Sequence, residues 1–208
     1  TLPHERLSPS SDVVGRRLAI LRRLRHAKAD GQPEVKVLVA PIRAVLQPLV
    51  RGIADLQPVS LHKGQAANFD DTIAALAAAG YHRVDLVEKR GEFAVRGGLI
   101  DVFPPMEEHP VRVEFWGDDI DEVRSFAVAD QRSLGEIPGG LWAPPCREML
   151  ITNDVKARAL QLQSQYPGLA EMLEKIAEGI YIEGLESLAP VLCDGMETLI
   201  DLLPDNAH

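Results

Sequence analysis

The sequence predicts a mixed α/β fold, in which an α+β unit with an antiparallel sheet lies between two segments of α/β type. Three observations favour this fold class. Near the N-terminus a helical pattern, a short apolar run and a second helical pattern follow one another, which is the order of an α/β layer. A middle stretch has one helical pattern followed by several short strand-like runs, as antiparallel sheets do. A last stretch, after the glycine- and proline-rich IPGGLWAPP, is mostly helical.

The first segment begins with a predicted helix. Ser11 and Asp12 are suitable capping residues, apolar residues then recur at helical spacing, and Gly31 lies beyond the end. The apolar, β-branched run 35–39 predicts a buried strand, and residues 42–50 predict another helix. One strand is too few for a parallel sheet. We therefore expect this segment to be part of a larger domain whose beginning is missing.

The second segment begins with a predicted helix that starts at Asp70 or Asp71 and ends at Gly80, with Ile73 and Leu76 on its apolar face. Short strand-like runs follow, separated by turn residues such as RGG and GDD. These runs cover residues 82–89, 92–96, 99–103, 111–116 and 120–128. Their close succession predicts the antiparallel sheet.

The third segment carries two helical patterns, DVKARALQLQSQY and PGLAEMLEKIAEG, and the second opens with proline, which is favoured at the first helical position. The sequence stops after LIDLLPDNAH without an evident finish, so we expect both ends of the chain to be cut.

Composition narrows the class of protein. A chain of 208 residues with 46% hydrophobic content can bury a sizeable core. The net charge of -9 argues against a module that coats nucleic acid by bulk electrostatics. No apolar run is long enough for a membrane span, and the polar, proline-rich start does not resemble a signal peptide. Two distant cysteines, Cys146 and Cys193, suit a reducing, cytoplasmic compartment.

The sequence shows none of the common catalytic motifs. There is no GxxxxGK[ST] loop to cradle a triphosphate, no GxSxG elbow and no HExxH helix. The six histidines share no ligand spacing. The acidic run GDDIDEV, residues 117–123, lacks the spacing of a calcium loop and is predicted to be a solvated hairpin turn. We therefore predict no catalytic residue, no metal site and no cofactor.

Basic residues crowd the first predicted helix. They could form a face that contacts phosphates, which would make the chain a DNA-contacting accessory module, or a solvated helix surface, as charge runs usually do. The overall acidity favours the solvated surface. The residues concerned are Arg16, Arg17, Arg22, Arg23, Arg25 and His26.

Alternation along two of the predicted strands separates a buried face from an open one. In VRVEFW, residues 111–116, the apolar side chains share one face, which leaves Arg112 and Trp116 on the other. In EFAVR, residues 92–96, the same parity puts Ala94 and Arg96 on the side opposite the apolar residues. The residues predicted to face the core, against the helix that contains Ile73 and Leu76, are Phe93, Val95, Val111, Val113 and Phe115.

Two interpretations of the open face follow. Arginine and tryptophan are enriched at the energetically important positions of protein interfaces, so Arg96, Arg112 and Trp116 could be a docking patch. Alternatively, Trp116 lies under a loop and both arginines pair with nearby carboxylates such as Glu92 and Glu114. The strand pattern alone leaves both open.

The run VDLVEKRGEFAVRGGLIDVFPPMEEHPVRVEFWGDDIDEVRSFAVADQRS, residues 84–133, closely resembles the transcription-repair coupling factors. It is also similar, more loosely, to the module with which the excision-repair protein UvrB binds UvrA. The flanking runs TLPHERLSPSSDVVGRRLAIL and HKGQAANFDDTIAALAAAGYHRVD resemble the coupling factors as well. They lack the tyrosine-rich hairpin of UvrB, which favours the coupling factors. The resemblance covers essentially the whole chain.

The resemblance implies a domain organisation. The coupling factors begin with a UvrB-like region, a degenerate helicase-like α/β domain split in two by an inserted UvrA-binding module. Residues 1–58 would then be the end of the first half, residues 59–141 the UvrA-binding module, and residues 142–208 the start of the second half. In the family, the contact with UvrA uses an arginine before a GG or GA pair, an arginine at the start of the next strand and an aromatic four residues later. These positions correspond to Arg96, Arg112 and Trp116. Phenylalanine occurs at the last position in the family, so Trp116 departs from it in residue type but keeps its aromatic and apolar character.

The resemblance also implies a role in transcription-coupled nucleotide excision repair. The family recruits UvrA to stalled RNA polymerase, and its ATP-driven motor acts on double-stranded DNA through domains outside this chain. The fragment itself is expected to dock a partner without catalysis. The family further implies that a C-terminal domain masks the docking patch in the resting protein.

Overall fold

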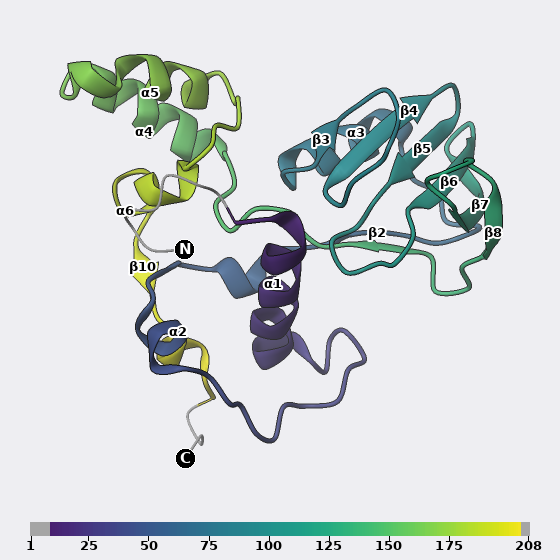
Figure 1. Cartoon of the computed structure of the whole chain (residues 1–208), viewed down its shortest axis with the longest axis horizontal. Helices are drawn as coiled ribbons and strands as arrows, with labels where there is room; N and C mark the ends of the chain where they lie inside the picture. The colour runs from purple at the N-terminus through teal and green to yellow at the C-terminus, as the bar shows by residue number, and fades with distance from the viewer. Residues whose placement is uncertain (1–8, 205–208) are drawn as a thin grey trace. The chain divides into compact units, whose positions relative to one another are not determined.

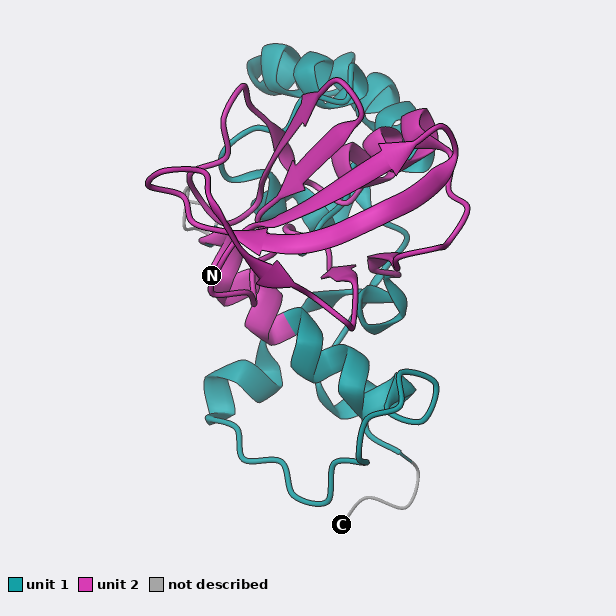
Figure 2. Cartoon of the chain, turned by 90° about the vertical axis from the view of Figure 1, so that its right-hand side faces the viewer, with its two compact units in different colours: residues 1–9, 18–56, 148–208 teal, residues 10–17, 57–147 magenta. Residues whose placement is uncertain are grey.

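The computed structural model describes residues 9–204, and the chain divides into two compact units (Figures 1 and 2). Among the described residues, unit 1 comprises Pro9 with residues 18–56 and 148–204, and unit 2 comprises residues 10–17 and 57–147. Within residues 9–204, no helix is both long and apolar enough to cross a membrane.

Unit 2 is built on a six-stranded sheet with the order β3-β4-β5-β6-β7-β8. All neighbouring strands are antiparallel except β3 and β4, which run parallel. The sheet confirms the mixed α and β class that the sequence predicts, and two strands have the predicted bounds, β4 and β6. The strands are β3 (His82–Arg83), β4 (Glu92–Arg96), β5 (Leu99–Val102), β6 (Val111–Trp116), β7 (Asp119–Phe126) and β8 (Ser133–Glu136).

Helix α3 (Phe69–Ala78) packs on one face of this sheet (Figure 1). The side chain of Asn68 caps it by accepting a hydrogen bond from the Asp71 backbone N–H at 3.0 Å, so the helix begins slightly earlier than the sequence predicts. It ends before Gly80, whose φ of 83° is favourable for glycine. A separate antiparallel pair, β2 (Val59–Leu61) and β9 (Leu141–Ala143), brings together the two ends of the segment 59–143.

The core of unit 2 lies between the sheet and α3. All five residues predicted to face inward belong to it, four of them buried and Val95 partly buried, and Ile73 and Leu76 of α3 belong to the same cluster. Phe115 meets the ring of Phe69 edge to face, with ring centroids 5.1 Å apart and an interplanar angle of 84°. The predicted apolar parity of β4 and β6 is therefore confirmed.

Part of the opposite face of the sheet is also covered. Residues 84–91 carry no strand after β3, although the sequence predicts one over residues 82–89. Instead, Val87 of this segment is buried against Ala94 and Phe103, with Val84 and Val128 beside them. Ala94 is thus on the predicted side of β4, but it is buried.

Helix α1 (Ser11–His26) confirms the first predicted helix. Its first residues belong to unit 2, where a Cβ on Gly15 would lie 2.2 Å from the Cβ of Pro105. Only glycine allows this close approach of the helix to the loop that follows β5. The remaining residues of α1 belong to unit 1, where Leu18 and Leu21 are buried.

Unit 1 is mostly helical. Helices α4 and α5 pack together around a core that contains Val155, Leu173 and Ile176, and β1 pairs with β10. Both predicted C-terminal helices are present, the second preceded by a 3-10 turn that opens at Pro167. The elements are α2 (Ile42–Leu46), β1 (Leu49–Val50), η1 (Ile53–Asp55), α4 (Asn153–Gln163), η2 (Pro167–Leu169), α5 (Ala170–Ala177), η3 (Leu185–Leu188), α6 (Ala189–Leu192), β10 (Met196–Glu197) and η4 (Ile200–Leu202).

The buried strand predicted at residues 35–39 is wrong. This segment has no regular secondary structure, and Val37 and Val39 are 80% and 91% exposed. A strand requires hydrogen bonds from a neighbouring strand, and no described residue pairs with this one. The helix predicted at 42–50 is shorter, because α2 ends at Leu46 and residues 49–50 form β1.

Burial of Cys146 predicts a pH dependence of stability. Desolvation raises the pKa of this thiol to about 12. The folded state therefore keeps a proton that the unfolded chain loses above about pH 8.5, so stability is complete below that pH and declines above it. We expect the free energy of unfolding to fall by about 1.4 kcal/mol per pH unit between the two pKa values. Denaturant titrations of the parent and Cys146→Ala at pH 8 and pH 10 test this; equal pH slopes would contradict it.

Candidate functional site

The face of the sheet opposite α3 contains the predicted docking residues, and we call its uncovered part, with Arg96, Arg112, Glu114 and Trp116, the outer face. Two tight hairpins shape one end of it. Gly97 and Gly98 connect β4 to β5, and Gly117 and Asp118 connect β6 to β7. The first residue of each loop is a glycine with positive φ, 59° and 65°, as a type II′ turn requires. Because β4, β5 and β6 alternate in direction, both hairpins lie at the same end of the sheet.

Arg96 and Trp116 each precede one of these hairpins. The register aligns Arg96 with Leu99 and Leu99 with Glu114, and Trp116 follows Glu114 by two residues. The two side chains therefore lie on the same face, on strands separated only by β5, with Cα atoms about 12 Å apart from ideal sheet spacings. Trp116 is 83% exposed. The alternative in which its indole lies under a loop is therefore wrong.

Asp101 joins the two arginines. This residue of β5 is only 1% exposed and is aligned with Arg112 of β6. Its Oδ1 accepts a hydrogen bond from Arg112 Nε at 2.6 Å, and its Oδ2 accepts from Arg112 Nη2 at 2.8 Å and from Arg96 Nη2 at 2.6 Å. One buried carboxylate thus holds two guanidinium groups, with bidentate geometry toward Arg112.

Arg112 is largely buried, which corrects the expectation that it is open to solvent. Its side chain is 12% exposed, against 43% for Arg96. The guanidinium carbon lies 4.5 Å from the centre of the Phe126 ring, and Nη2 lies 3.4 Å from the amide oxygen of Gln131. The hydrogen bonds to Asp101 raise the pKa of Arg112 against the opposing effect of burial. Arg112 is therefore a fixed, charged part of the sheet surface.

The remaining charges of this face are paired among themselves. Arg124 of β7 contacts Glu122 of the same strand and Glu114 of β6, the latter at 3.4 Å. Glu92 instead accepts hydrogen bonds from the backbone N–H groups of Glu88 and Lys89. The alternative in which both arginines pair with a nearby carboxylate is thus confirmed, but the carboxylate is Asp101 and not Glu92 or Glu114.

The sequence pattern does not identify Asp101, Phe126 and Gln131 as part of the site. A signal for Asp101 exists, since it is a lone acid in the apolar strand LIDV, with the parity of the open face. Phe126 follows a register irregularity between β7 and β8, which obscures its parity. Gln131 is positioned by a backbone φ of 61° that no sequence rule for glutamine predicts.

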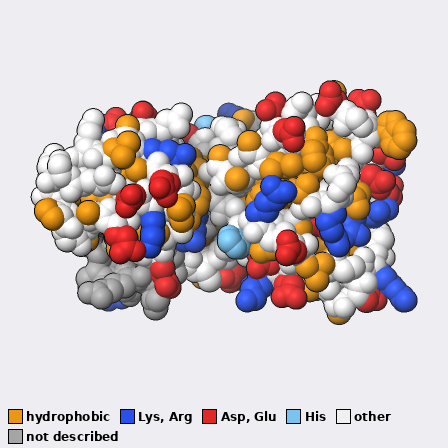
Figure 3. Space-filling view, turned by 90° about the horizontal axis from the view of Figure 1, so that it is seen from above, with side chains coloured by type: hydrophobic (Ala, Val, Ile, Leu, Met, Phe, Trp, Pro, Cys, Tyr) orange, Lys and Arg blue, Asp and Glu red, His pale blue; other side chains and the backbone are white. Residues whose placement is uncertain are grey.

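The basic residues of α1 are mostly engaged within unit 1. Arg22 is buried, donates to both carboxylate oxygens of Asp30 at 2.7 Å and donates to the Leu56 carbonyl at 2.9 Å. Asp55 pairs with His26 at 2.6 Å and with Arg25 at 3.7 Å. These contacts within the unit favour a solvated helix surface over a phosphate-contacting face. On the face of the molecule shown in Figure 3, basic and acidic side chains are interspersed.

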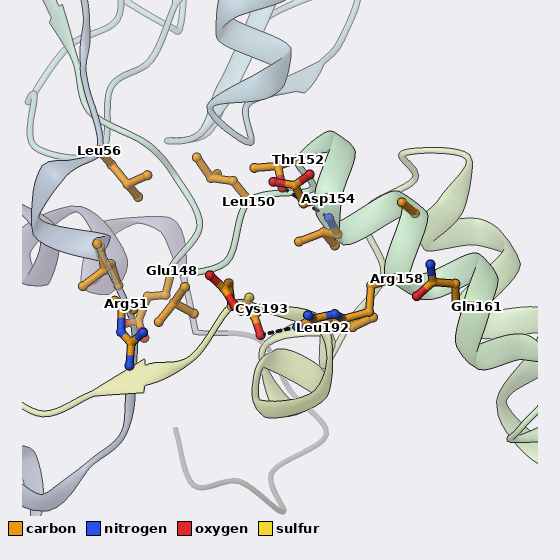
Figure 4. Close-up of a pocket in the computed structure, with 16 residues that line it drawn as sticks. Arg51, Leu56, Glu148, Leu150, Thr152, Asp154, Arg158, Gln161, Leu192 and Cys193 are labelled. Atoms are coloured by element: carbon orange, nitrogen blue, oxygen red, sulfur yellow. Dashed lines mark hydrogen bonds between the residues drawn. The ribbon is translucent and has the colours of Figure 1, made fainter.

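Unit 1 contains a cavity of about 530 Å³, drawn in Figure 4. Its wall mixes acidic and basic side chains, and Arg158 donates from Nη1 to the Cys193 carbonyl at 2.7 Å. Across residues 9–204, no group of three His, Cys, Asp or Glu side chains could hold a metal ion.

Comparison with known proteins gives consistent matches. The family model described as "UvrB interaction domain" matches residues 59–141. A transcription-repair-coupling factor from Mycobacterium tuberculosis is 50% identical over 99% of this chain, and the one from Escherichia coli is 35% identical over 66% of it. UvrABC system protein B from Streptococcus agalactiae is 33% identical over 60% of the chain.

The matched part of each relative is small. The chain spans 18% of the length of the Mycobacterium tuberculosis protein, 12% of the Escherichia coli protein and 19% of the Streptococcus agalactiae protein. The matches therefore describe one region of a longer protein.

Proposed function

Because this chain belongs to the transcription-repair-coupling factor family and contains a UvrB interaction domain, we propose that it recruits UvrA to stalled RNA polymerase in transcription-coupled nucleotide excision repair. It acts as a docking module without catalysis of its own. The observation that carries the proposal is the outer face, where an exposed indole and an accessible guanidinium lie on one rigid sheet. Residues 59–141 form the module, and residues 1–58 and 142–208 belong to the two halves of a degenerate helicase-like domain.

The chemistry of the outer face suits protein binding. The Trp116 indole offers apolar area that becomes buried on docking, and Arg96 offers donors for carboxylate or carbonyl groups of UvrA. Both belong to a hydrogen-bonded sheet, so little backbone freedom is lost on binding. Arg112 contributes positive charge at the centre of the face while bound to Asp101.

The experiment that tests this proposal is a titration of the 208-residue chain with purified UvrA. We expect saturable binding that weakens only modestly between 50 and 200 mM salt, together with no retention of double-stranded DNA by the chain alone. Strong DNA retention with a steep salt dependence would support the basic helix α1 as the binding element. Absence of any UvrA binding would contradict recruitment by this module.

A second expectation concerns nucleotides. The ATP-driven motor, and the contacts with RNA polymerase and double-stranded DNA, belong to other domains of the full protein, and the sequence has no triphosphate loop. Thermal melts of the chain with and without ATP and Mg²⁺ should therefore coincide. A melting temperature that rises saturably with ATP would contradict this, because a ligand that binds the folded state stabilises it.

A further inference from the structure

The outer face depends on a single buried carboxylate. Asp101 accepts three hydrogen bonds from two arginines on the strands either side of it, and it is almost inaccessible to solvent. Without that carboxylate the two like-charged guanidinium groups would repel each other, and the buried Arg112 would lose its principal partner.

Arg112 and Arg96 differ in what they can offer a partner. Arg112 uses Nε and Nη2 on Asp101, lies against Phe126 and has Gln131 at its edge. Arg96 uses only Nη2 on Asp101 and is 43% exposed, which leaves Nε and Nη1 pointing to no described carboxylate. Arg96 is thus the guanidinium that a docking protein can reach. Arg112 lies beside it, bound to the same carboxylate of Asp101.

We infer that Asp101 is a positioning residue of the docking site: it fixes Arg96 and Arg112 in the geometry that the partner recognises, and Arg112 stays bound to Asp101 when the partner docks. This inference rests on the proposed function. Asp101 does not itself contact the partner, because it lies beneath the two guanidinium groups. It acts by restricting their motion before binding, which lowers the entropic cost of docking.

The direction in which one substitution changes the affinity distinguishes a positioning role of Asp101 from an effect of its charge alone. Asp101→Asn keeps the shape of the side chain but replaces one acceptor oxygen with an NH₂ group that faces guanidinium donors. It also makes the face more positive, and that change alone would strengthen attraction to acidic groups of a partner. Positioning predicts the opposite result, weaker binding.

Glu171→Gln is the matched control. Glu171 lies on α5 in unit 1, outside the docking module, and pairs with Lys175 at 2.8 Å. Its substitution changes the net charge of the chain by the same amount as Asp101→Asn. We expect the affinity for UvrA to fall at least tenfold in Asp101→Asn and to change less than twofold in Glu171→Gln. Combined with Arg96→Ala, Asp101→Asn should weaken binding by clearly less than the product of the separate losses.

Nuclear magnetic resonance of the parent chain gives a second test that needs no variant. The Arg112 Nε–H donates to Asp101 and is shielded, so it should exchange with solvent at least tenfold more slowly than the Arg96 Nε–H. Equal exchange rates would overturn the inference even if Asp101→Asn failed to fold.

The outcomes also separate this inference from the proposed function. If the parent chain does not bind UvrA, the proposed function fails and the inference with it. If the parent binds, Arg96→Ala weakens binding and Asp101→Asn behaves like Glu171→Gln, then only the positioning role of Asp101 is overturned.

Discussion

Phe115→Ala should unfold unit 2 or bring it close to unfolding. Phe115 is buried in the core between the sheet and α3, with its ring edge to face against Phe69. Truncation removes a ring from a close-packed site and leaves a cavity, which costs about 3–5 kcal/mol for phenylalanine. Domains of this size have only about 5–15 kcal/mol of stability to lose. Denaturant titration followed by circular dichroism measures the change.

Trp116→Ala is the control for this result. Trp116 is the next residue on the same strand, but its side chain points away from the core and is 83% exposed. Exposed side chains usually change stability by no more than about 0.5 kcal/mol. If Phe115→Ala melted like the parent and Trp116→Ala collapsed, the assignment of the two faces would be reversed, and the docking site would be lost with it.

The second large effect is on affinity for UvrA. Single alanine substitutions at Arg96 and Trp116 should each weaken binding by about 1–3 kcal/mol, roughly 5- to 150-fold. The thermal stability of Trp116→Ala should stay near that of the parent, and that of Arg96→Ala should fall less than that of Arg112→Ala, because Arg96→Ala removes a single hydrogen bond to Asp101. Arg112→Ala should weaken binding as well and also lower stability by about 1–3 kcal/mol, because it removes the bidentate partner of the buried Asp101.

Arg112→Lys offers a milder version of the same change. A lysine ammonium keeps a positive charge beside Asp101 but cannot donate through two nitrogens held in one plane. It should therefore fold with a smaller loss of stability than Arg112→Ala and still bind UvrA more weakly than the parent. Parental affinity in Arg112→Lys would show that charge alone is sufficient at this position.

Strand alternation predicts much of unit 2 from the sequence. The period of two along β4 and β6 identifies the buried side chains and the face that bears Arg96, Arg112 and Trp116, because one face of this sheet is covered by a helix. The same reasoning fails at residues 35–39. Hydrophobicity and β-branching describe what a strand can bury, but they do not supply the neighbouring strand whose hydrogen bonds would hold it.

The candidate site is predicted in its residues but not in its contacts. Alternation places two arginines on one face, whereas their shared partner depends on the register between β4, β5 and β6. That register brings Asp101 beside Arg112, and the packing of Phe126 buries the guanidinium. These are consequences of strand pairing, so no pattern within a single strand could predict that Arg112 is confined while Arg96 remains accessible.

Titration of UvrA with the parent chain, Arg96→Ala, Trp116→Ala and the control Arg43→Ala tests the central claim most directly. Arg43 is exposed on α2, outside the module, so its substitution removes one positive charge without touching the outer face. The docking site predicts losses of roughly 5- to 150-fold for Arg96→Ala and Trp116→Ala, and parental affinity for Arg43→Ala. If Arg96→Ala and Trp116→Ala both fold normally and bind UvrA as tightly as the parent, UvrA docks elsewhere on this chain.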